Sequence, residues 1–123
     1  MISSRLNECR ILAVEDEYFL AMDLKRDLAA AGAHVLGPVP SIQKALAIIA
    51  SELRIDGAVL DINLSGEMSF PVADALMLRR VPFVFTTGYV DGDLGKRYRH
   101  IGRCEKPTRF PVLLEALTTA ISG

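Results

Sequence analysis

Residues 10–16 read Arg10-Ile11-Leu12-Ala13-Val14-Glu15-Asp16, an apolar run that ends in two acids. A continuous apolar run without alternation is typical of a parallel strand that is covered on both faces. Gly57-Ala58-Val59-Leu60 and Pro82-Phe83-Val84-Phe85 have the same character. Residues 33–37 and 101–104 contain more polar side chains and predict less buried or edge strands. We therefore expect five strands, of which three are buried.

Segments with helical periodicity separate these runs. Leu20, Leu24 and Leu28 repeat every four residues and predict a first helix that stops near Gly32. Two further helices are expected, one capped by Ser41 and one that begins near Pro71 and ends before Pro82. The apolar stripe of the second helix is Ile42, Ala45, Leu46 and Ile49, and that of the last helix is Phe110, Leu113, Leu114, Leu117 and Ile121.

Residues 91–100 differ from the other segments, because they contain two glycines and only Leu94 and Tyr98 to face a core. They predict a fourth helix that is short or irregular. Strands that alternate with helices favour right-handed crossovers. The expected fold is therefore α/β, a doubly wound five-stranded parallel sheet with helices on both faces. We expect one domain over residues 1–123, with its core at residues 8–121.

The charge balance excludes several function classes. The 123 residues carry 14 Lys and Arg against 15 Asp and Glu, a net charge of -1, so no global field attracts nucleic acid or an anionic membrane. No apolar run approaches the roughly 20 residues of a membrane span, and we expect a cytoplasmic protein.

The basic cluster at residues 96–103 is interpreted as a solvated face or a partner-docking loop. Cys9 and Cys104 are expected to be reduced thiols and not zinc ligands.

Four polar groups follow the predicted strands, namely Glu15-Asp16, Asp61, Thr86-Thr87 and Lys106-Pro107. In open parallel α/β sheets, ligands bind beyond the carboxyl ends of the strands. Clustered carboxylates repel one another unless a cation joins them, and Mg²⁺ suits such hard oxygen ligands. Each group alone has a structural alternative, since an acidic pair can cap a helix and an Asp can begin a turn. Their joint occurrence favours a functional site.

The strand-end motifs resemble those of the receiver domains of two-component response regulators. Residues 11–17, with their acidic pair, resemble the first strand of that family, and Leu60-Asp61-Ile62-Asn63-Leu64 resembles the strand that ends in the phospho-accepting aspartate. Thr87-Gly88 and Lys106-Pro107 match the remaining motifs. The resemblance covers essentially the whole chain and implies a flavodoxin-like strand order 2-1-3-4-5, which would separate Cys9 from Cys104.

The resemblance also implies residue roles. Asp61 would take a phosphoryl group from a sensor histidine kinase or a phosphotransfer protein, and Thr87 and Lys106 would bind that group. Asp16, Asp61 and the main-chain carbonyl of Asn63 would bind Mg²⁺, with Glu15 assisting through water. Such a receiver is a signalling domain and not an enzyme with its own substrate. It would change shape to regulate a downstream protein, as a monomer or weak dimer, without binding nucleic acid or membrane directly.

A narrower resemblance is to the FAT GUY subgroup of stand-alone receivers, which implies a partner kinase of the HWE family. It rests on residues 61–64, 71–76 and 82–89. Thr86 departs from this pattern, which usually has Ala there. Arg103 occupies the position where most receivers have a switching Tyr or Phe. We therefore expect Tyr89 and residues 91–100 to carry the switch, with Arg103 either pairing with Asp91 or Asp93 in one state or standing as a solvated edge arginine.

Other functions remain open at this point. A phosphatase of the haloacid-dehalogenase type also uses an Asp after a strand with Mg²⁺, but it would need an acid where this chain has Asn63. A structural module with a degenerate site is a further alternative. Within the receiver hypothesis, the chain could be a single-domain regulator, a phosphate sink, or an excised receiver of a larger regulator or hybrid kinase.

Overall fold

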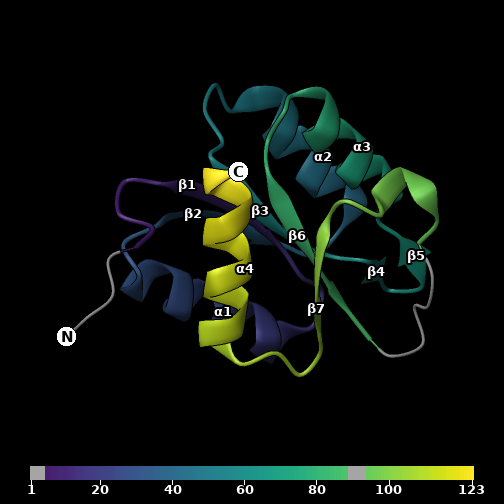
Figure 1. Ribbon diagram of the computed structural model, residues 1–123. Helices are drawn as coiled ribbons and strands as arrows, with labels where there is room; N and C mark the ends of the chain where they lie inside the picture. Colours follow the sequence, from purple (N-terminus) through teal and green to yellow (C-terminus); the bar gives the residue numbers. More distant parts are fainter. Residues whose placement is uncertain (1–4, 89–93) are drawn as a thin grey trace.

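The computed structural model describes residues 5–88 and 94–123, which form a parallel sheet with helices on both faces (Figure 1). The sheet strands are β1 (Arg10–Val14), β2 (His34–Val39), β3 (Gly57–Asp61), β6 (Phe83–Thr87) and β7 (Gly102–Glu105). The helices are α1 (Tyr18–Ala30), α2 (Ile42–Ser51), α3 (Phe70–Leu78) and α4 (Phe110–Ser122). The strand order is β2-β1-β3-β6-β7, so the predicted doubly wound fold with order 2-1-3-4-5 is confirmed.

Two apolar cores lie on opposite faces of the sheet. Leu12 and Val14 of β1 belong to the core that α2 and α3 cover, while Ile11 and Ala13 belong to the core that α1 and α4 cover. Alternate residues of one strand therefore face different cores. Every position of a central strand has to be apolar for this reason, which explains the continuous runs in the sequence.

β2 and β7 form the two edges of the sheet, as their higher polar content predicted. β2 runs past its predicted end at Gly37 to Val39, because β1 pairs with β2 up to the partners Val14 and Val39. Gly102 and Arg103 of β7 are exposed. These edge strands complete the frame, and the central strands position the strand-end residues.

The helix ends follow their predicted signals. Ser41 Oγ accepts a hydrogen bond from the Lys44 amide (3.2 Å) at the start of α2, and Pro71 lies in the first turn of α3. Gly32 follows α1 with a φ of 98°, a left-handed conformation that glycine adopts without strain.

The predicted apolar stripe of α1 is partly wrong. Leu28 is fully buried, but Leu20 is 40% exposed, and Ala21 is buried in its place. Four residues rotate about 40° beyond one full helical turn, so leucines at successive spacings of four drift around the helix. Leu20 therefore lies at the rim of the core, next to the carboxyl end of β1.

The segment before β7 contains only a short 3₁₀ helix, η2 (Lys96–Tyr98), which confirms the predicted irregular element. Tyr98 anchors this segment. Its ring stacks on Phe70 of α3 at a centroid distance of 4.7 Å and meets Phe85 of β6 edge-on at 6.0 Å. Its hydroxyl donates to Asp74 Oδ1 (2.8 Å). Residues 94–101 are thus attached to α3 through the buried Tyr98 side chain and through an ion pair between Arg97 and Asp74 (3.0 Å).

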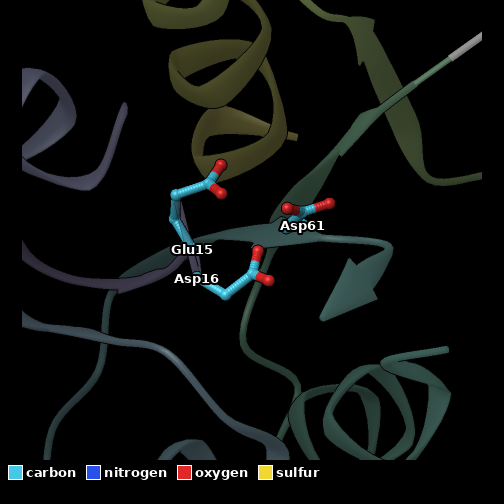
Figure 2. A group of neighbouring side chains, drawn as sticks. All are labelled: Glu15, Asp16 and Asp61. Carbon is cyan, nitrogen blue, oxygen red and sulfur yellow. The ribbon is translucent and has the colours of Figure 1, made fainter. Parts of the chain in front are cut away.

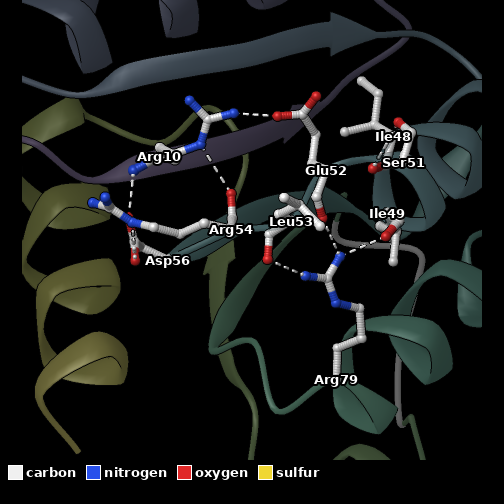
Figure 3. Close-up of polar contacts among 9 residues, drawn as sticks. All are labelled: Arg10, Ile48, Ile49, Ser51, Glu52, Leu53, Arg54, Asp56 and Arg79. Atoms are coloured by element: carbon white, nitrogen blue, oxygen red, sulfur yellow. Dashed lines mark hydrogen bonds and ion pairs between the residues drawn. The ribbon is translucent and has the colours of Figure 1, made fainter.

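An arginine network fixes the loop between α2 and β3 (Figure 3). The Arg79 guanidinium donates to the carbonyls of Ile49, Glu52 (2.9 Å) and Leu53 (3.1 Å). Arg10 pairs with Glu52 and donates to the Arg54 carbonyl (2.9 Å). This loop leads into β3, so the network fixes the start of the strand whose last residue is Asp61.

A small antiparallel hairpin, β4 (Asn63–Leu64) and β5 (Glu67–Met68), follows β3. This hairpin was not predicted from the sequence, because each of its strands has only two residues. Cys9 and Cys104 are free thiols, and the pKa of each is raised by burial. Over residues 5–88 and 94–123, no helix combines the length and the apolar character that a membrane crossing requires.

Candidate functional site

Three carboxylates meet at the carboxyl edge of the sheet (Figure 2). Glu15 and Asp16 follow β1, and Asp61 is the last residue of the neighbouring strand β3. One oxygen from each carboxylate lies within 4.8 Å of the others. Glu15 and Asp61 are buried and Asp16 is half-buried. The predicted convergence of the acidic pair with Asp61 is therefore present in the structure.

Lys106, from the loop after β7, joins this cluster. Its Nζ lies 2.6 Å from Asp61 Oδ2 and 2.9 Å from Glu15 Oε1. Its backbone amide donates to the Thr87 carbonyl (2.7 Å), which fixes the loop to the end of β6. Three carboxylates against one ammonium leave the cluster with an excess of negative charge when all four groups are ionised.

The charges shift the acidities of the central pair. The pKa of Asp61 is raised from 3.8 to about 6, mainly by burial, because a carboxylate loses hydration in the interior. The nearby Glu15 charge contributes to this rise, and the bond from Lys106 opposes it. Burial alone would lower the pKa of Lys106, but its bonds to Asp61 and Glu15 outweigh burial and raise it. Lys106 is therefore a permanent cation at this site.

Backbone amides hold the carboxylates from the other side. Glu15 Oε2 accepts from the Glu17 amide (3.0 Å), and Asp61 Oδ1 accepts from the Asn63 amide (3.1 Å). The cap of α1 is Glu17, whose Oε2 accepts from the Leu20 amide (2.7 Å). The acidic pair Glu15-Asp16 is thus not the helix cap that the structural alternative required.

The cluster opens into a hollow of about 420 Å³. Its lining includes the three acids, Asn63, Ser65 and Lys106. Carboxylate and carbonyl oxygens are the ligands that Mg²⁺ prefers, and that ion keeps several of its waters. The donor set and the partial exposure of Asp16 fit such a partly hydrated ion.

The two threonines at the end of β6 lie on opposite faces of the strand. Thr86 is the register partner of Asp61 and faces the same side of the sheet. It lines a second hollow of about 170 Å³ together with Glu15 and Lys106. Thr87 is buried and lies on the face of Phe85. In the sequence Thr86 stands out only as a departure from a pattern, whereas in the structure it lines the wall of the site.

Two serines near Asp61 were missed by the sequence analysis. Ser65 donates to Asp16 from both its amide and its hydroxyl. Ser69, which is fully buried, donates from Oγ to the Asp61 carbonyl (2.6 Å). Single serines carry no motif, and only the hairpin turn that brings Ser65 back to Asp16 could have indicated its role.

The structure describes only some of the residues that were predicted to carry the switch. Tyr89, Asp91 and Asp93 lie outside the described residues. Arg103 is exposed on β7 and is the register partner of Phe85, so it faces the same side of the sheet. On that side Phe85 meets the rings of Phe83 (5.4 Å) and Tyr98 (6.0 Å) edge-on. Tyr98 of η2 therefore places an aromatic ring on the face to which Arg103 belongs.

No protein-family model and no curated protein sequence matches the chain. Among solved structures, SdrG from Sphingomonas melonis Fr1 is 38% identical, with coverage of 94% of this chain and 98% of SdrG and a TM-score of 0.81. The BeF3-activated conformation of SdrG is 36% identical over 94% and 95% of the two chains, with a TM-score of 0.72.

A response regulator receiver protein from Sinorhizobium medicae WSM419 is 26% identical, with coverage of 96% and 98% and a TM-score of 0.81. These similarities extend over almost the full length of each chain. Together with the cluster of Asp61, Lys106 and the acidic pair, these similarities show that the chain belongs to the response regulator receiver domains of two-component systems.

Proposed function

We propose that this chain receives a phosphoryl group on Asp61 from a phosphohistidine of a sensor histidine kinase or a phosphotransfer protein, with Mg²⁺ at the acidic cluster. The observation that carries the proposal is the position of Asp61. Its buried carboxylate lies between the Lys106 ammonium and the carboxylates of Glu15 and Asp16. A nucleophile, a fixed cation and a set of hard oxygen ligands in one hollow are the parts that phosphoryl transfer requires.

In the proposed transfer, an Asp61 carboxylate oxygen attacks phosphorus. An O–P bond forms, the P–N bond of the donor breaks, and the imidazole nitrogen keeps the electron pair while its ring takes a proton from solvent. Asp61 has to be ionised to attack, and its pKa of about 6 leaves it ionised at neutral pH. Lys106 Nζ and the Thr87 hydroxyl would bind the oxygens of the transferred group.

The carboxylates of Asp16 and Asp61 and the main-chain carbonyl of Asn63 would hold Mg²⁺, with Glu15 assisting through water. When bound, Mg²⁺ would neutralise charge on the phosphoryl oxygens. The Glu15 contact to Lys106 (2.9 Å) supports an indirect role for Glu15, because one of its oxygens is already used.

The donor has to reach Asp61 across the rim of the hollow. The first turn of α1 forms part of that rim, directly after Asp16, and exposes Tyr18 (67%) and Phe19 (73%). Exposed aromatic side chains next to a reactive site are typical of protein interfaces. We therefore propose that the phosphodonor protein contacts this turn during transfer.

Phosphorylation would alter the shape of the chain through Thr87 and Lys106, since the new charge attracts both. The bond from the Lys106 amide to the Thr87 carbonyl joins their two loops. Motion of the β6 end would reach Tyr98 through Phe85, two residues before Thr87. We propose that residues 94–101 pass the change to a downstream protein. Tyr89 and Arg103 are proposed to take part in the same switch.

We also propose that residues 1–123 form a single domain and that the partner kinase belongs to the HWE family. The second proposal rests on the FAT GUY resemblance alone. The phosphatase alternative lacks its required acid. Asn63 Oδ1 accepts from the Gly66 amide (2.8 Å), so this side chain closes a turn.

A labelling experiment tests the proposal. The wild-type protein, with Mg²⁺ and a small-molecule phosphodonor, should gain the mass of one phosphoryl group. Labelling should require Mg²⁺, and it should slow only at a pH below the metal-free Asp61 pKa of about 6, because a bound cation favours the ionised carboxylate. Asp61→Asn should abolish labelling, whereas the exposed Asp23→Asn should not change it. Full labelling of Asp61→Asn would disprove the assignment.

A further inference from the structure

The hairpin that follows Asp61 has an unusual turn. Leu64 pairs with Glu67, so only Ser65 and Gly66 connect the two strands. Both have left-handed backbones, with φ of 53° and 91°. Positive φ at both central residues defines a type I′ turn, for which Asn-Gly is the preferred sequence. Glycine fits such a position easily, but a serine there is strained.

The turn places Ser65 against Asp16, which lies 49 positions earlier in the chain and follows a different strand. The Ser65 amide lies 2.9 Å and its Oγ 2.8 Å from the same oxygen, Asp16 Oδ2. Two residues before Ser65, the Asn63 amide donates to Asp61 Oδ1 (3.1 Å). A single hairpin therefore orients one oxygen of each of two carboxylates from neighbouring strands.

The two donors from Ser65 leave Asp16 Oδ1 as the oxygen that is free to face a cation. Asp16 is the least buried of the three acids, so packing restrains it least. A carboxylate that is already oriented loses less conformational freedom when it binds a metal. Outer hydrogen bonds of this kind orient metal ligands in many proteins.

We propose that Ser65 is a positioning residue for Mg²⁺, which acts by fixing the Asp16 carboxylate through its hydroxyl. The proposal rests on the proposed function of the acidic cluster. The backbone amide bond to Asp16 does not depend on the side chain, so the hydroxyl is the part that serine contributes. Its removal should weaken Mg²⁺ binding about tenfold, the lower end of the effect typical of outer-shell partners.

Two substitutions separate the hydroxyl from the turn. Ser65→Gly removes Oγ but suits the left-handed backbone, and Ser65→Ala removes Oγ and keeps the strain. Mg²⁺ titration followed by amide NMR shifts should give about tenfold weaker binding for both. Ser51→Ala removes a serine hydroxyl from the end of α2, where it contacts only the Ile48 carbonyl (3.4 Å). It should bind Mg²⁺ as the wild type does.

Wild-type affinity in Ser65→Gly would overturn the proposal, because turn geometry alone would then suffice. Tighter binding would overturn it too, since Ser65 would then compete with the metal for Asp16. If the wild-type protein shows no saturable Mg²⁺ shifts at residues 15, 16, 61 and 63, the proposed function fails instead.

A measurement without metal tests the contact itself. In EDTA, the free energies of unfolding of the wild type, Ser65→Gly, Asp16→Asn and the double variant form a double-mutant cycle. The effects of the two single substitutions should be non-additive, because either one removes the same charge-assisted bond. Additive effects would show that the Ser65 hydroxyl does not hold Asp16 in solution, and they would refute the proposal.

Discussion

Asp61→Asn should stabilise the metal-free protein at alkaline pH. Asp61 is 3% exposed, and its pKa rises on folding from 3.8 to about 6. At 1.36 kcal/mol per pKa unit, this rise corresponds to about 3 kcal/mol of folding free energy that ionised Asp61 opposes. The amide has nearly the same shape and carries no charge, so most of this cost should disappear.

The sign of the pH dependence follows from proton linkage. Between pH 4 and 6 the folded protein binds more protons at Asp61 than the unfolded chain does. The contribution of Asp61 to stability is therefore most favourable below pH 4 and is lost as the pH rises through 6. The advantage of Asp61→Asn should be about 2 to 3 kcal/mol at pH 8 and should shrink towards zero near pH 4.

Urea denaturation followed by far-UV circular dichroism in EDTA measures this difference, and the chain contains no Trp that would favour fluorescence. Asp23→Asn is the control, since Asp23 is exposed and makes only a surface ion pair with Arg26 (3.2 Å). A variant Asp61→Asn that is less stable than the wild type at pH 8 would refute the reasoning. A gain that does not change between pH 8 and pH 5 would refute it equally.

Three other substitutions have definite expected outcomes. Lys106→Met should lower the free energy of unfolding by about 3 kcal/mol at pH 8, because buried Glu15 and Asp61 lose their cation. The stability should recover in part at pH 5. The same urea titration checks this prediction, and a loss of stability that is independent of pH would contradict it. Tyr98→Phe should cost about 1 kcal/mol through the lost bond to Asp74, whereas Tyr18→Phe, at an exposed side chain, should cost nothing measurable by the same titration. Arg79→Lys should cost about 1 to 2 kcal/mol, because an ammonium cannot reach the three carbonyls that the guanidinium binds, and thermal unfolding of this variant beside the exposed Arg26→Lys measures the difference.

Much of the fold could be predicted because central parallel strands leave a strong signal. Val59 and Val84 face one core while Leu60 and Phe85 face the other, so both strands read as continuous apolar runs. The stripe of α1 was predicted less well, because leucines four residues apart drift around a helix and Leu20 ends at the rim. The hairpin of residues 63–68 was missed, since two-residue strands have no periodicity to detect.

The site was predicted as a set of residues but not as a set of contacts. The strand order brings Asp16, Asp61 and Lys106 to one edge of the sheet. This convergence could be predicted, because the sequence indicates a parallel topology. The bonds of Ser65 to Asp16 depend on a left-handed turn at a serine, which sequence preferences disfavour. Likewise, Phe85 meets the rings of Phe83 and Tyr98. The contact with Tyr98 could not be predicted, because it depends on how a short irregular helix packs against α3.

The excess negative charge of the cluster links stability to function. The burial of Asp61 and its repulsion by Glu15 oppose folding in the metal-free state, and one lysine offsets them only in part. A divalent cation would remove that cost, so Mg²⁺ should stabilise the wild-type protein more than Asp61→Asn. The same burial keeps the Asp61 carboxylate poorly hydrated and therefore available as a nucleophile. A site that destabilises the empty protein is in this way prepared both for the metal and for the phosphoryl group.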